Sequence, residues 1–427
     1  MKILNFEKLA ATPKRKSALK IAEAGLLAID TKLAVKETVN LEGGILRIKD
    51  EKIDLAYIGR IFVIGIGKCS LEAGAALEEI LGEKIAAGVV IDVRPGKLRK
   101  IKTYAGTHPL PTERNVDATK EIIEVLRSAK ESDLVIAIVS GGGSTLLCQP
   151  QKFTCVKEAA LMECLTKAGA DIYKINTVRK HLSLARGGYL AKYAYPARMI
   201  SLIFSDVPHD NLEFVASGPT FMDTTTVKDA EQVLDGYKVE EVCGLPKAGL
   251  VETPKDQKYF EKVSNILVVS NKNALEAMES EARSLGFSAE IVDAGFSGEA
   301  RKVGKDVILN LKEKPPHTVL LYGGESTVTV KGRGKGGRNQ ELALAALKYL
   351  SDNQLILALA SDGRDNSDYA GAVCDKITRE RATELGLDSQ KFLDENDSGN
   401  FFGKVGDYLI TVETGSNVSD LIIAINE

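Results

Sequence analysis

One glycine-rich segment organises this chain: Tyr322-Gly-Gly-Glu-Ser-Thr-Val-Thr-Val-Lys-Gly-Arg-Gly-Lys-Gly-Gly-Arg-Asn-Gln-Glu341. An apolar run, Thr318 to Leu321, precedes the segment, and residues 342–347 follow it with apolar side chains at helical spacing. The pattern predicts a strand, a glycine-rich turn, a short β-branched strand, a basic loop and then a helix.

The basic loop of this segment has the composition of a phosphate site. Its glycines can take positive φ and let the backbone approach a ligand, and its cations stand just before a helix whose first N–H groups are free. These residues are Gly332, Gly334, Gly336 and Gly337, with Arg333, Lys335 and Arg338. The loop lacks the Gly-Lys-Ser/Thr ending of a Walker A motif, and a solvated hairpin loop is the alternative interpretation.

Length and composition set the class of protein. A chain of 427 residues exceeds the size that one hydrophobic core supports, so we expect two domains. Its residues are 44% hydrophobic and 27% charged, as in soluble globular proteins, and its net charge of -3 gives no reason to expect nucleic-acid binding. No stretch approaches the ~20 apolar residues of a membrane helix, and residues 1–27 lack the apolar core of a signal peptide. We therefore expect a cytoplasmic protein that binds neither nucleic acid nor membrane.

The cysteines show no metal-binding pattern. None forms a C-x-x-C pair, and no histidine stands at zinc-finger spacing from them, so we interpret them all as buried thiols in a reducing compartment. They are Cys69, Cys148, Cys155, Cys164, Cys243 and Cys374.

Apolar runs alternate with helical patterns through most of the chain, after an amphipathic helical stretch at residues 3–38. This alternation predicts α/β layers with largely parallel sheets in both halves. A charged stretch with few strand signals, residues 220–262, separates the halves. We place the domain boundary within it, giving a larger domain over residues 1–258 and a smaller one over 259–427. The expected strands are 61–66, 88–93, 134–139, 199–204, 266–269, 289–292, 318–321, 355–359, 408–412 and 421–425.

The most unusual loops follow expected strands, where α/β sheets bind ligands. Lys68 comes after Gly65-Ile-Gly67 and is expected to neutralise a transferring phosphoryl group. A surface lysine at a helix start is the alternative, and a dinucleotide fingerprint would need glycine at Ser70. Ser140-Gly-Gly-Gly-Ser144 offers backbone amides and a hydroxyl to phosphate, with Ser144 as the expected helix N-cap. A purely structural turn is the alternative there.

Carboxylates follow two further strands. Asp206 and Asp210 come after the strand at 199–204, and Asp362 comes after the strand at 355–359. Such carboxylates hold Mg²⁺ or accept a proton from a substrate hydroxyl. Two later acidic residues of the second loop are interpreted as turn formers: Asp365 and Asp368.

A polar pattern marks one face of an expected helix. Asn176, Arg179 and Ser183 recur at helical spacing. From that face Arg179 would meet a substrate carboxylate, although an ordinary exposed helix explains the pattern equally well.

Several motifs, in order along nearly the whole chain, together resemble the glycerate 2-kinase family, whose carboxyl-terminal part is the MOFRL domain. They are Ser140-Gly-Gly-Gly-Ser144, Asn176-x-x-Arg-Lys-His-Leu-Ser183, Ser205-Asp-Val-Pro208, Ala216-Ser-Gly-Pro219, Gly323-Gly-Glu325 and Gly336-Gly-Arg-Asn-Gln-Glu341. The resemblance implies a larger Rossmann-like α/β/α domain, a smaller MOFRL-type α/β domain and an active site in the cleft between them. It also implies ATP-dependent phosphorylation of D-glycerate at its 2-hydroxyl, giving 2-phosphoglycerate and ADP, with Mg²⁺ or another divalent cation.

The resemblance also assigns residues. The functional lysine, aspartate and arginine of the family fall on Lys68, Asp206 and Arg338. We expect Lys68, Arg179 and Arg338 to bind the substrate, and Asp206, Asp210 and Asp362 to hold the metal. From the glycine-rich loops and the motif around Arg338 we expect the nucleotide to bind at Gly141, Gly142, Gly143, Ser144, Gly323, Gly324, Glu325 and Asn339.

Two other functions compete with the kinase. One is an NAD(P)H-dependent hydroxypyruvate reductase, a name that relatives of the family have carried, and the incomplete glycine fingerprint argues against it. The other is a nucleotide-binding sensor without chemistry. The expected small-molecule partners are D-glycerate and ATP, and a homodimer is compatible with the sequence, which does not reveal the oligomeric state.

Overall fold

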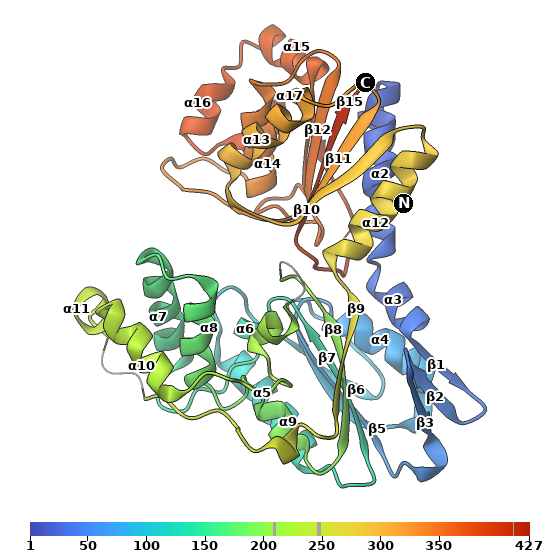
Figure 1. Ribbon diagram of the computed structural model, residues 1–427, viewed down its shortest axis with the longest axis vertical. Coiled ribbons are helices and arrows are strands. Elements are labelled where there is room, and N and C mark those ends of the chain that lie inside the picture. Colours follow the sequence, from blue (N-terminus) through green and yellow to red (C-terminus); the bar gives the residue numbers. More distant parts are fainter. Residues whose placement is uncertain (208–210, 246–248, 413) are drawn as a thin grey trace. The chain divides into compact units, whose positions relative to one another are not determined.

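The structure is a computed structural model that describes residues 1–207, 211–245, 249–412 and 414–427. The chain divides into two compact units (Figure 1). The central unit comprises Thr31–Ser205 and Asn211–Val268, and the terminal unit comprises Met1–Asp30, a short segment that begins at Asp206, and Val269–Glu427. The later division lies close to the predicted boundary at 258/259. Residues 1–30, however, belong to the same unit as the C-terminal half. The prediction of one boundary between two continuous domains does not describe this arrangement.

A six-stranded sheet forms the middle of the central unit, in the order β6-β5-β4-β7-β8-β9. The pairings from β6 to β8 are all parallel, as predicted. Every residue of β4 and β7 is buried, which is typical of strands covered on both faces. The strands are β4 (Ile61–Ile66), β5 (Ile85–Asp92), β6 (Ile101–Ala105), β7 (Leu134–Ser140), β8 (Arg198–Phe204) and β9 (Val263–Val269).

Helices cover both faces of this sheet. Val89 and Ile91 of β5 pack in one cluster with α5 (Glu113–Arg127) and α9 (Tyr189–Ala194). Val90 points to the opposite face, where a Cβ at Gly74 of α4 (Ser70–Leu81) would lie 3.4 Å from its Cγ1. A second core joins α7 (Cys155–Lys167), α8 (Ile172–His181), α10 (Val227–Gly236) and α11 (Val239–Cys243).

The other elements of the central unit are short. An antiparallel sheet, which the sequence analysis did not predict, pairs β1 with β2 and β2 with β3. The elements are α3 (Thr31–Thr38), β1 (Val39–Glu42), β2 (Ile45–Ile48), β3 (Glu51–Asp54), α6 (Gly143–Leu146) and the 3₁₀ helices η1 (Leu55–Tyr57), η2 (Gly82–Lys84), η4 (Leu212–Ser217) and η5 (Gln257–Tyr259).

The terminal unit also contains a six-stranded sheet, in the order β10-β11-β15-β12-β13-β14. The prediction of a largely parallel sheet is wrong for this half: among the strands that the structure describes, only β10 and β11 pair in parallel. The reason is that β15 inserts between β11 and β12, antiparallel to both. The strands are β10 (Ser288–Glu299), β11 (Thr318–Thr327), β12 (Gln354–Ala360), β13 (Gly371–Asp375), β14 (Tyr408–Leu409) and β15 (Asp420–Asn426).

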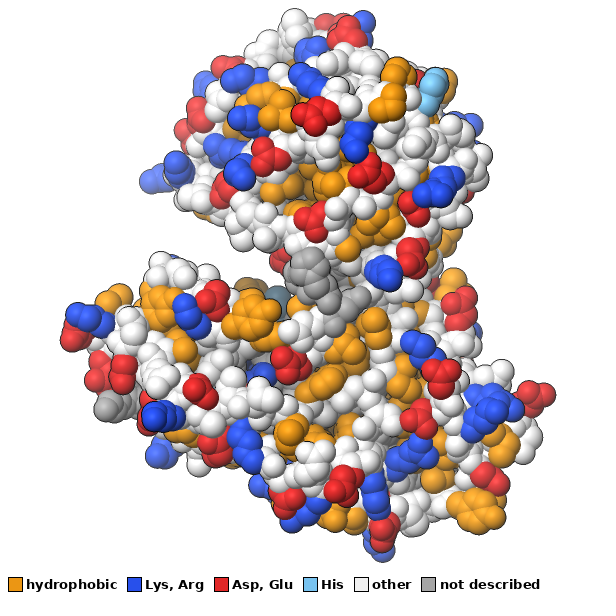
Figure 2. All heavy atoms as spheres, viewed as in Figure 1, with side chains coloured by type: hydrophobic (Ala, Val, Ile, Leu, Met, Phe, Trp, Pro, Cys, Tyr) orange, Lys and Arg blue, Asp and Glu red, His pale blue; other side chains and the backbone are white. Residues whose placement is uncertain are grey.

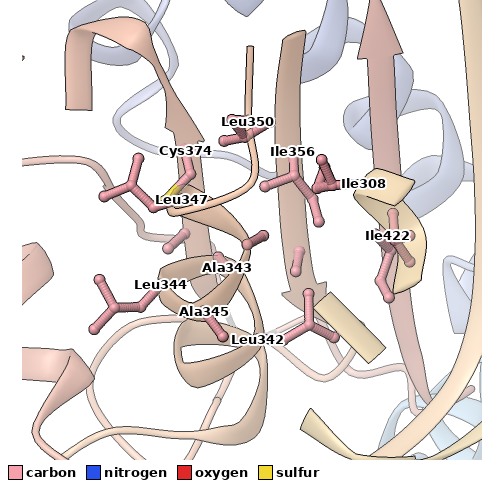
Figure 3. Packing of buried hydrophobic residues seen from close by; sticks show 14 of the residues in the cluster. Ile308, Leu342, Ala343, Leu344, Ala345, Leu347, Leu350, Ile356, Cys374 and Ile422 are labelled. Carbon is pink, nitrogen blue, oxygen red and sulfur yellow. The ribbon is translucent and has the colours of Figure 1, made fainter. Parts of the chain in front are cut away.

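Two layers of helices enclose this sheet, α2 and α12 on one side and α13 and α14 on the other (Figure 1). The core on the α14 side contains Leu342, Ile356 and Ile422 (Figure 3). The helices are α1 (Phe6–Leu9), α2 (Pro13–Ala28), α12 (Asn271–Ser284), α13 (Ala300–Lys312), α14 (Arg338–Leu347), α15 (Lys376–Glu384), α16 (Ser389–Asp394) and α17 (Ser398–Val405).

Helix α2 is an integral part of the terminal unit. A Cβ at Gly25 would lie 2.7 Å from Met278 of α12, so the two helices pack at very short range. Arg15 of α2 is only 1% exposed and donates hydrogen bonds to Asp375 and Asp407, at 2.6 and 2.7 Å. These buried ion pairs connect the N-terminal helix to residues that lie more than 300 positions later in the chain.

The glycine-rich segment from Tyr322 differs in part from its prediction. Strand β11 continues through Gly323 and Gly324 to Thr327, because both neighbouring strands pair with it there. A turn at these glycines and a second short strand after them are therefore wrong predictions. The basic loop and the helix that begins at Arg338 are confirmed.

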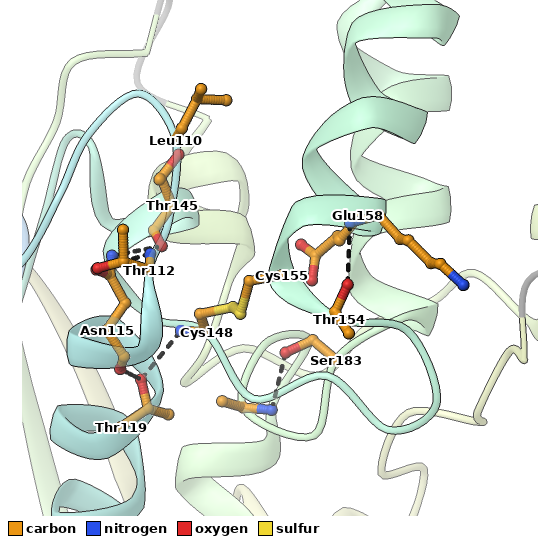
Figure 4. The surroundings of a disulfide bond; sticks show 12 residues. Leu110, Thr112, Asn115, Thr119, Thr145, Cys148, Thr154, Cys155, Glu158 and Ser183 are labelled. Atoms are coloured by element: carbon orange, nitrogen blue, oxygen red, sulfur yellow. Dashed lines mark hydrogen bonds between the residues drawn. A yellow bond between two sulfur atoms is a disulfide. The ribbon is translucent and has the colours of Figure 1, made fainter. Parts of the chain in front are cut away.

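Four of the six cysteines form disulfides, so the prediction that all are thiols is wrong. Cys148 pairs with Cys155 (Figure 4), and Cys164 pairs with Cys243, with Cα–Cα distances of 6.8 and 6.2 Å. Spacing along the chain does not reveal such pairs, because partners meet only in the folded structure. Cys69 and Cys374 are free and buried, as predicted, and burial raises the pKa of the Cys69 thiol to about 12.

On the face drawn in Figure 2, positively and negatively charged side chains are interspersed over both units, with hydrophobic ones between them. Within the described part of the chain, no helix combines the length and the apolar character that a membrane crossing requires.

Candidate active site

The glycine loop after β7 is held in a conformation that favours glycine. Gly142 has φ of +76° and is the N-cap of α6, so the prediction of Ser144 as N-cap is wrong by two positions. A Cβ at Gly142 would lie 3.1 Å from Lys68 Cγ and 3.5 Å from His108 Cδ2. A Cβ at Gly143 would lie 2.5 Å from that of Ala216. A side chain at Gly143 would therefore collide with Ala216, and one at Gly142 would press on Lys68.

Lys68 lies beside this loop, because β4 and β7 are neighbouring parallel strands. The Lys68 amide donates to the Gly141 carbonyl oxygen at 2.9 Å. Gly67, with φ of +115°, passes so close to Ser140 that a Cβ would lie 2.1 Å from its Oγ. The loops after β4 and β7 are thus locked together at one edge of the sheet.

A strained turn faces the glycine loop. Ala216 and Ser217 have φ of +51° and +59°, and Gly218 continues the left-handed conformation at +60°. Such conformations are costly for residues with a Cβ and concentrate at functional sites. The Ser217 hydroxyl donates to Asn176 Oδ1 at 2.8 Å, and its oxygen lies 2.8 Å from Ser144 Oγ. The turn therefore connects the glycine loop to helix α8.

Arg179, one turn after Asn176 on α8, is half-buried, and within the described residues its guanidinium has no hydrogen bond or ion pair. Burial and the neighbouring Arg186 lower its pKa to about 10, although Glu158 opposes the effect. The structure thus places Arg179 on the helix that reaches the glycine loop through Asn176.

In the terminal unit, Arg338 begins α14 and is held by two carboxylates. Its Nε and Nη2 donate to Asp420 at 2.6 and 3.0 Å, and its Nη1 donates to Glu325. Burial raises the pKa of Asp420 to about 7, against the opposite effect of Arg338. The pair is the planar, two-point contact that guanidinium and carboxylate groups prefer.

Asp365 supports the start of the same helix. Its carboxylate accepts hydrogen bonds from the amides of Asn339 and Gln340, at 3.0 and 2.8 Å, and from both of their side chains. Burial raises its pKa. Asn339 is fully buried by these contacts. Asp365 therefore has a structural role that orients the helix carrying Arg338.

Asp206 and Asp362 both adjoin the loop of residues 417–419, just before β15 in the terminal unit. Ser419 Oγ donates to the Asp206 carbonyl oxygen at 2.7 Å, and Asn417 Nδ2 donates to its carboxylate at 3.3 Å. The Ser361 amide, next to Asp362, donates to the Ser419 carbonyl oxygen at 3.2 Å. Asp210 lies outside the described residues.

Known proteins resemble this chain over nearly its whole length. The family model of a domain of unknown function, DUF4147, matches residues 17–247, and the model of the MOFRL family matches residues 318–420. A protein named glycerate 2-kinase from Pyrococcus horikoshii is 36% identical over 96% of this chain and 98% of the relative. This chain belongs to the glycerate 2-kinase family. The crystal structure of glycerate kinase from Thermotoga maritima matches the family member described here with a TM-score of 0.83 at 35% identity, over 96% of this chain and 99% of that one.

The same family includes proteins with another name. A putative hydroxypyruvate reductase from Agrobacterium vitis is 36% identical over 85% of this chain and 86% of the relative. In this member of the glycerate 2-kinase family, the described residues include no group of three or more His, Cys, Asp or Glu side chains placed to hold a metal.

Several residues of this glycerate 2-kinase family member escaped the sequence analysis. Asp420 was not singled out, because nothing in the sequence relates it to Arg338. Glu158 and Arg186, which form a buried ion pair, carried no spacing signal. Ala216 and Ser217 stood in a quoted motif, but a left-handed backbone at alanine and serine has no local signature.

Proposed function

We propose that this protein is an ATP-dependent kinase that phosphorylates D-glycerate at its 2-hydroxyl, giving 2-phosphoglycerate and ADP. The observation that carries the proposal is the position of Lys68 against the glycine loop, at the carboxyl ends of β4 and β7. A cation beside the backbone amides of a glycine loop suits phosphoryl transfer, which mainly requires positioning and charge stabilisation. Relatives named for this activity support the proposal.

Each cation has a defined part in the proposed reaction. The loop from Gly141 to Ser144 holds nucleotide phosphates, and Lys68 stabilises the charge on the transferring group. Arg338 is the second cation. Its Nη1 contacts Glu325, whose side chain is 49% exposed, and we expect a phosphate oxygen to replace that carboxylate. Nucleotide contacts by the other assigned residues stay predictions: Gly323, Gly324 and Asn339.

Carboxylates near the loop of residues 417–419 fit a divalent cation, Mg²⁺ in this proposal. Asp206 and Asp362 provide the oxygen donors that Mg²⁺ prefers, and one or two carboxylates suffice when phosphates and water complete its shell. When bound, the ion would neutralise the β- and γ-phosphates. Asp206 is also the proposed acceptor of the proton from the 2-hydroxyl.

A coupled assay tests the proposal. ADP release should require both D-glycerate and a divalent cation, and ³¹P NMR of the product should show 2-phosphoglycerate. Loss of nicotinamide absorbance with hydroxypyruvate would instead establish a reductase, the function named for the Agrobacterium relative. ATP binding without turnover would establish a sensor. A cytoplasmic location and a homodimer stay predictions.

A further inference from the structure

A buried ion pair, Glu158 with Arg186, lies near the half-buried Arg179 of α8. Arg186 is 1% exposed and Glu158 is 4% exposed, and Arg186 Nη1 donates a hydrogen bond to Glu158 Oε1. Arg179 is close enough to both for their charges to shift its pKa. Two positive charges therefore share one negative charge, so the cluster carries one uncompensated positive charge.

The cluster also has unused hydrogen-bonding capacity. Arg186 Nε and Glu158 Oε2 are buried without a partner, and the Arg179 guanidinium has none within the described residues. Arg179 is half-buried, and a cation that is partly removed from water is costly to keep uncompensated unless something pairs with it. A bound anion would supply both the missing charge and the missing acceptors for Arg179.

The glycine loop lies next to this cluster through a chain of contacts. Asn176 and Arg179 are three residues apart on α8 and therefore share a face. Asn176 binds Ser217, which binds Ser144 of the loop. An anion on Arg179 would thus lie beside the residues proposed to hold the phosphates.

A disulfide fixes the other side of the cluster. Cys148 follows the glycine loop closely, and its amide donates to Thr119 Oγ1 at 3.0 Å. Cys155, its partner, is the first residue of α7, and Glu158 lies one turn later on the same helix (Figure 4). The Cys148–Cys155 disulfide therefore links the helix that carries Glu158 to the segment that follows the glycine loop.

We propose that Arg179 is the subsite for the carboxylate of the 2-hydroxy acid, and that the Glu158–Arg186 ion pair sets its specificity. The proposal rests on the proposed function and names how that site recognises its substrate. A guanidinium binds a carboxylate at two points. The single net charge of the cluster matches a monoanion such as a carboxylate, whereas the phosphates of ATP carry more charge and have Lys68 and the glycine loop.

Variants of Arg179 give the first test. Arg179→Gln should raise the KM for D-glycerate by about 10- to 100-fold, since hydrogen bonds to charged groups are lost, and should leave the KM for ATP unchanged. Arg179→Lys keeps the charge without the two-point contact, so its KM for D-glycerate should lie between those of the natural protein and Arg179→Gln. Lys174→Gln removes an exposed cation from the same helix and should change neither constant.

Binding measurements separate this inference from the kinase assignment. Calorimetry without nucleotide should show D-glycerate binding to the natural protein, no binding of glycerol, which lacks a carboxylate, and much weaker D-glycerate binding to Arg179→Gln. That result would support the subsite even if no phosphoryl transfer were found. In the absence of ligand, Arg179→Gln should melt no lower than the natural protein, because it removes an unpartnered charge.

Glu158→Gln tests the specificity role. Removing the carboxylate leaves two positive charges, so inhibition by inorganic phosphate should strengthen at least several-fold relative to inhibition by a simple monocarboxylate. Equal D-glycerate affinity in Arg179→Gln and the natural protein would overturn the proposal. A raised KM for ATP alone would also overturn it, by making Arg179 a phosphate ligand. These two outcomes can be read even if Glu158→Gln does not fold.

Discussion

Gly142 is the position at which one added side chain should separate nucleotide binding from folding. In Gly142→Val, the new side chain would press on Lys68 and His108 and occupy the space proposed for a phosphate. We expect ATP affinity to fall at least about tenfold, with some loss of stability from the left-handed backbone, about 1–2 kcal/mol. Isothermal calorimetry with ATP and thermal melting measure the two effects.

Gly169→Val is the matched control for the stability that Gly142→Val loses through its left-handed backbone. Gly169 has φ of +80°, similar to the +76° of Gly142, but a Cβ there would meet nothing within 4 Å. Its variant should lose comparable stability and keep the natural ATP affinity. Unchanged ATP affinity in a folded Gly142→Val protein would show that the glycine loop is structural.

Asp420 should make stability depend on pH. Burial raises its pKa in the folded protein to about 7, from an ordinary value of 3.8. The folded state thus holds the proton more tightly than the unfolded state does, so this stabilisation is complete below pH 3.8 and is lost as the pH rises through about 7. Relative to Asp420→Asn, the natural protein should lose about 1 kcal/mol of stability per pH unit across that window.

Chemical unfolding at several pH values measures this difference. Asp368→Asn, which changes an exposed carboxylate of the same unit, should follow the natural profile. Parallel profiles for Asp420→Asn and the natural protein would show that Asp420 is ionised throughout.

The sequence indicates candidate site residues only where a local pattern marks them. Lys68 and Gly142 stand at the end of a buried apolar run, and parallel strands bring such ends to one edge, so their proximity was predictable. Asp420 and Glu158 act through partners far along the chain. No spacing rule connects them, because only the complete fold brings the pairs together.

At the level of elements, strands were easier to recognise than their directions. The apolar run of β15 looks like that of β7, yet β15 lies between two antiparallel neighbours and β7 between two parallel ones. Direction depends on where the chain returns to the sheet, and a strand's own residues do not record it. The strands β1 to β3 were not predicted, because each is only four residues long and so short a run gives a weak alternating pattern.

The two disulfides should stabilise to different degrees. Cys148–Cys155 spans 7 positions and Cys164–Cys243 spans 79. A cross-link that closes a longer loop removes more entropy from the unfolded chain. We expect Cys148→Ser to cost about 2–3 kcal/mol and Cys164→Ser about 4–5 kcal/mol on that basis.

Urea unfolding under oxidising conditions measures both losses. Repeating it with a dithiol reductant provides the control, since the natural protein should then lose stability and approach the variants. Equal stability with and without reductant would show that the disulfides contribute nothing.

At the scale of the whole molecule, the two proposed cations belong to different units, Lys68 to the central and Arg338 to the terminal one. If both act on one transferring phosphoryl group, Lys68→Ala and Arg338→Ala should each lower kcat by roughly 10²–10³-fold. The double variant should then be less impaired than the product of the two losses, because residues that act as a unit are not additive.

Steady-state kinetics of the natural protein, the two single variants and the double variant measure whether the losses in kcat multiply. Lys97→Ala, which removes an exposed cation of the central unit, should be neutral alone and in combination. Losses that multiply would mean that Lys68 and Arg338 act on separate steps or separate groups.

The attachment of α2 to the terminal unit affects how the protein is made. Ribosomes release the chain N-terminus first, at about 5–20 residues per second. Arg15 and Gly25 therefore emerge early, whereas Met278, Asp375 and Asp407, which they contact, are translated only after the whole central unit. For on the order of tens of seconds, α2 therefore exists before the residues that cover its apolar face and pair with Arg15 have been translated. During that interval, α2 must either be bound by a chaperone or remain soluble on its own.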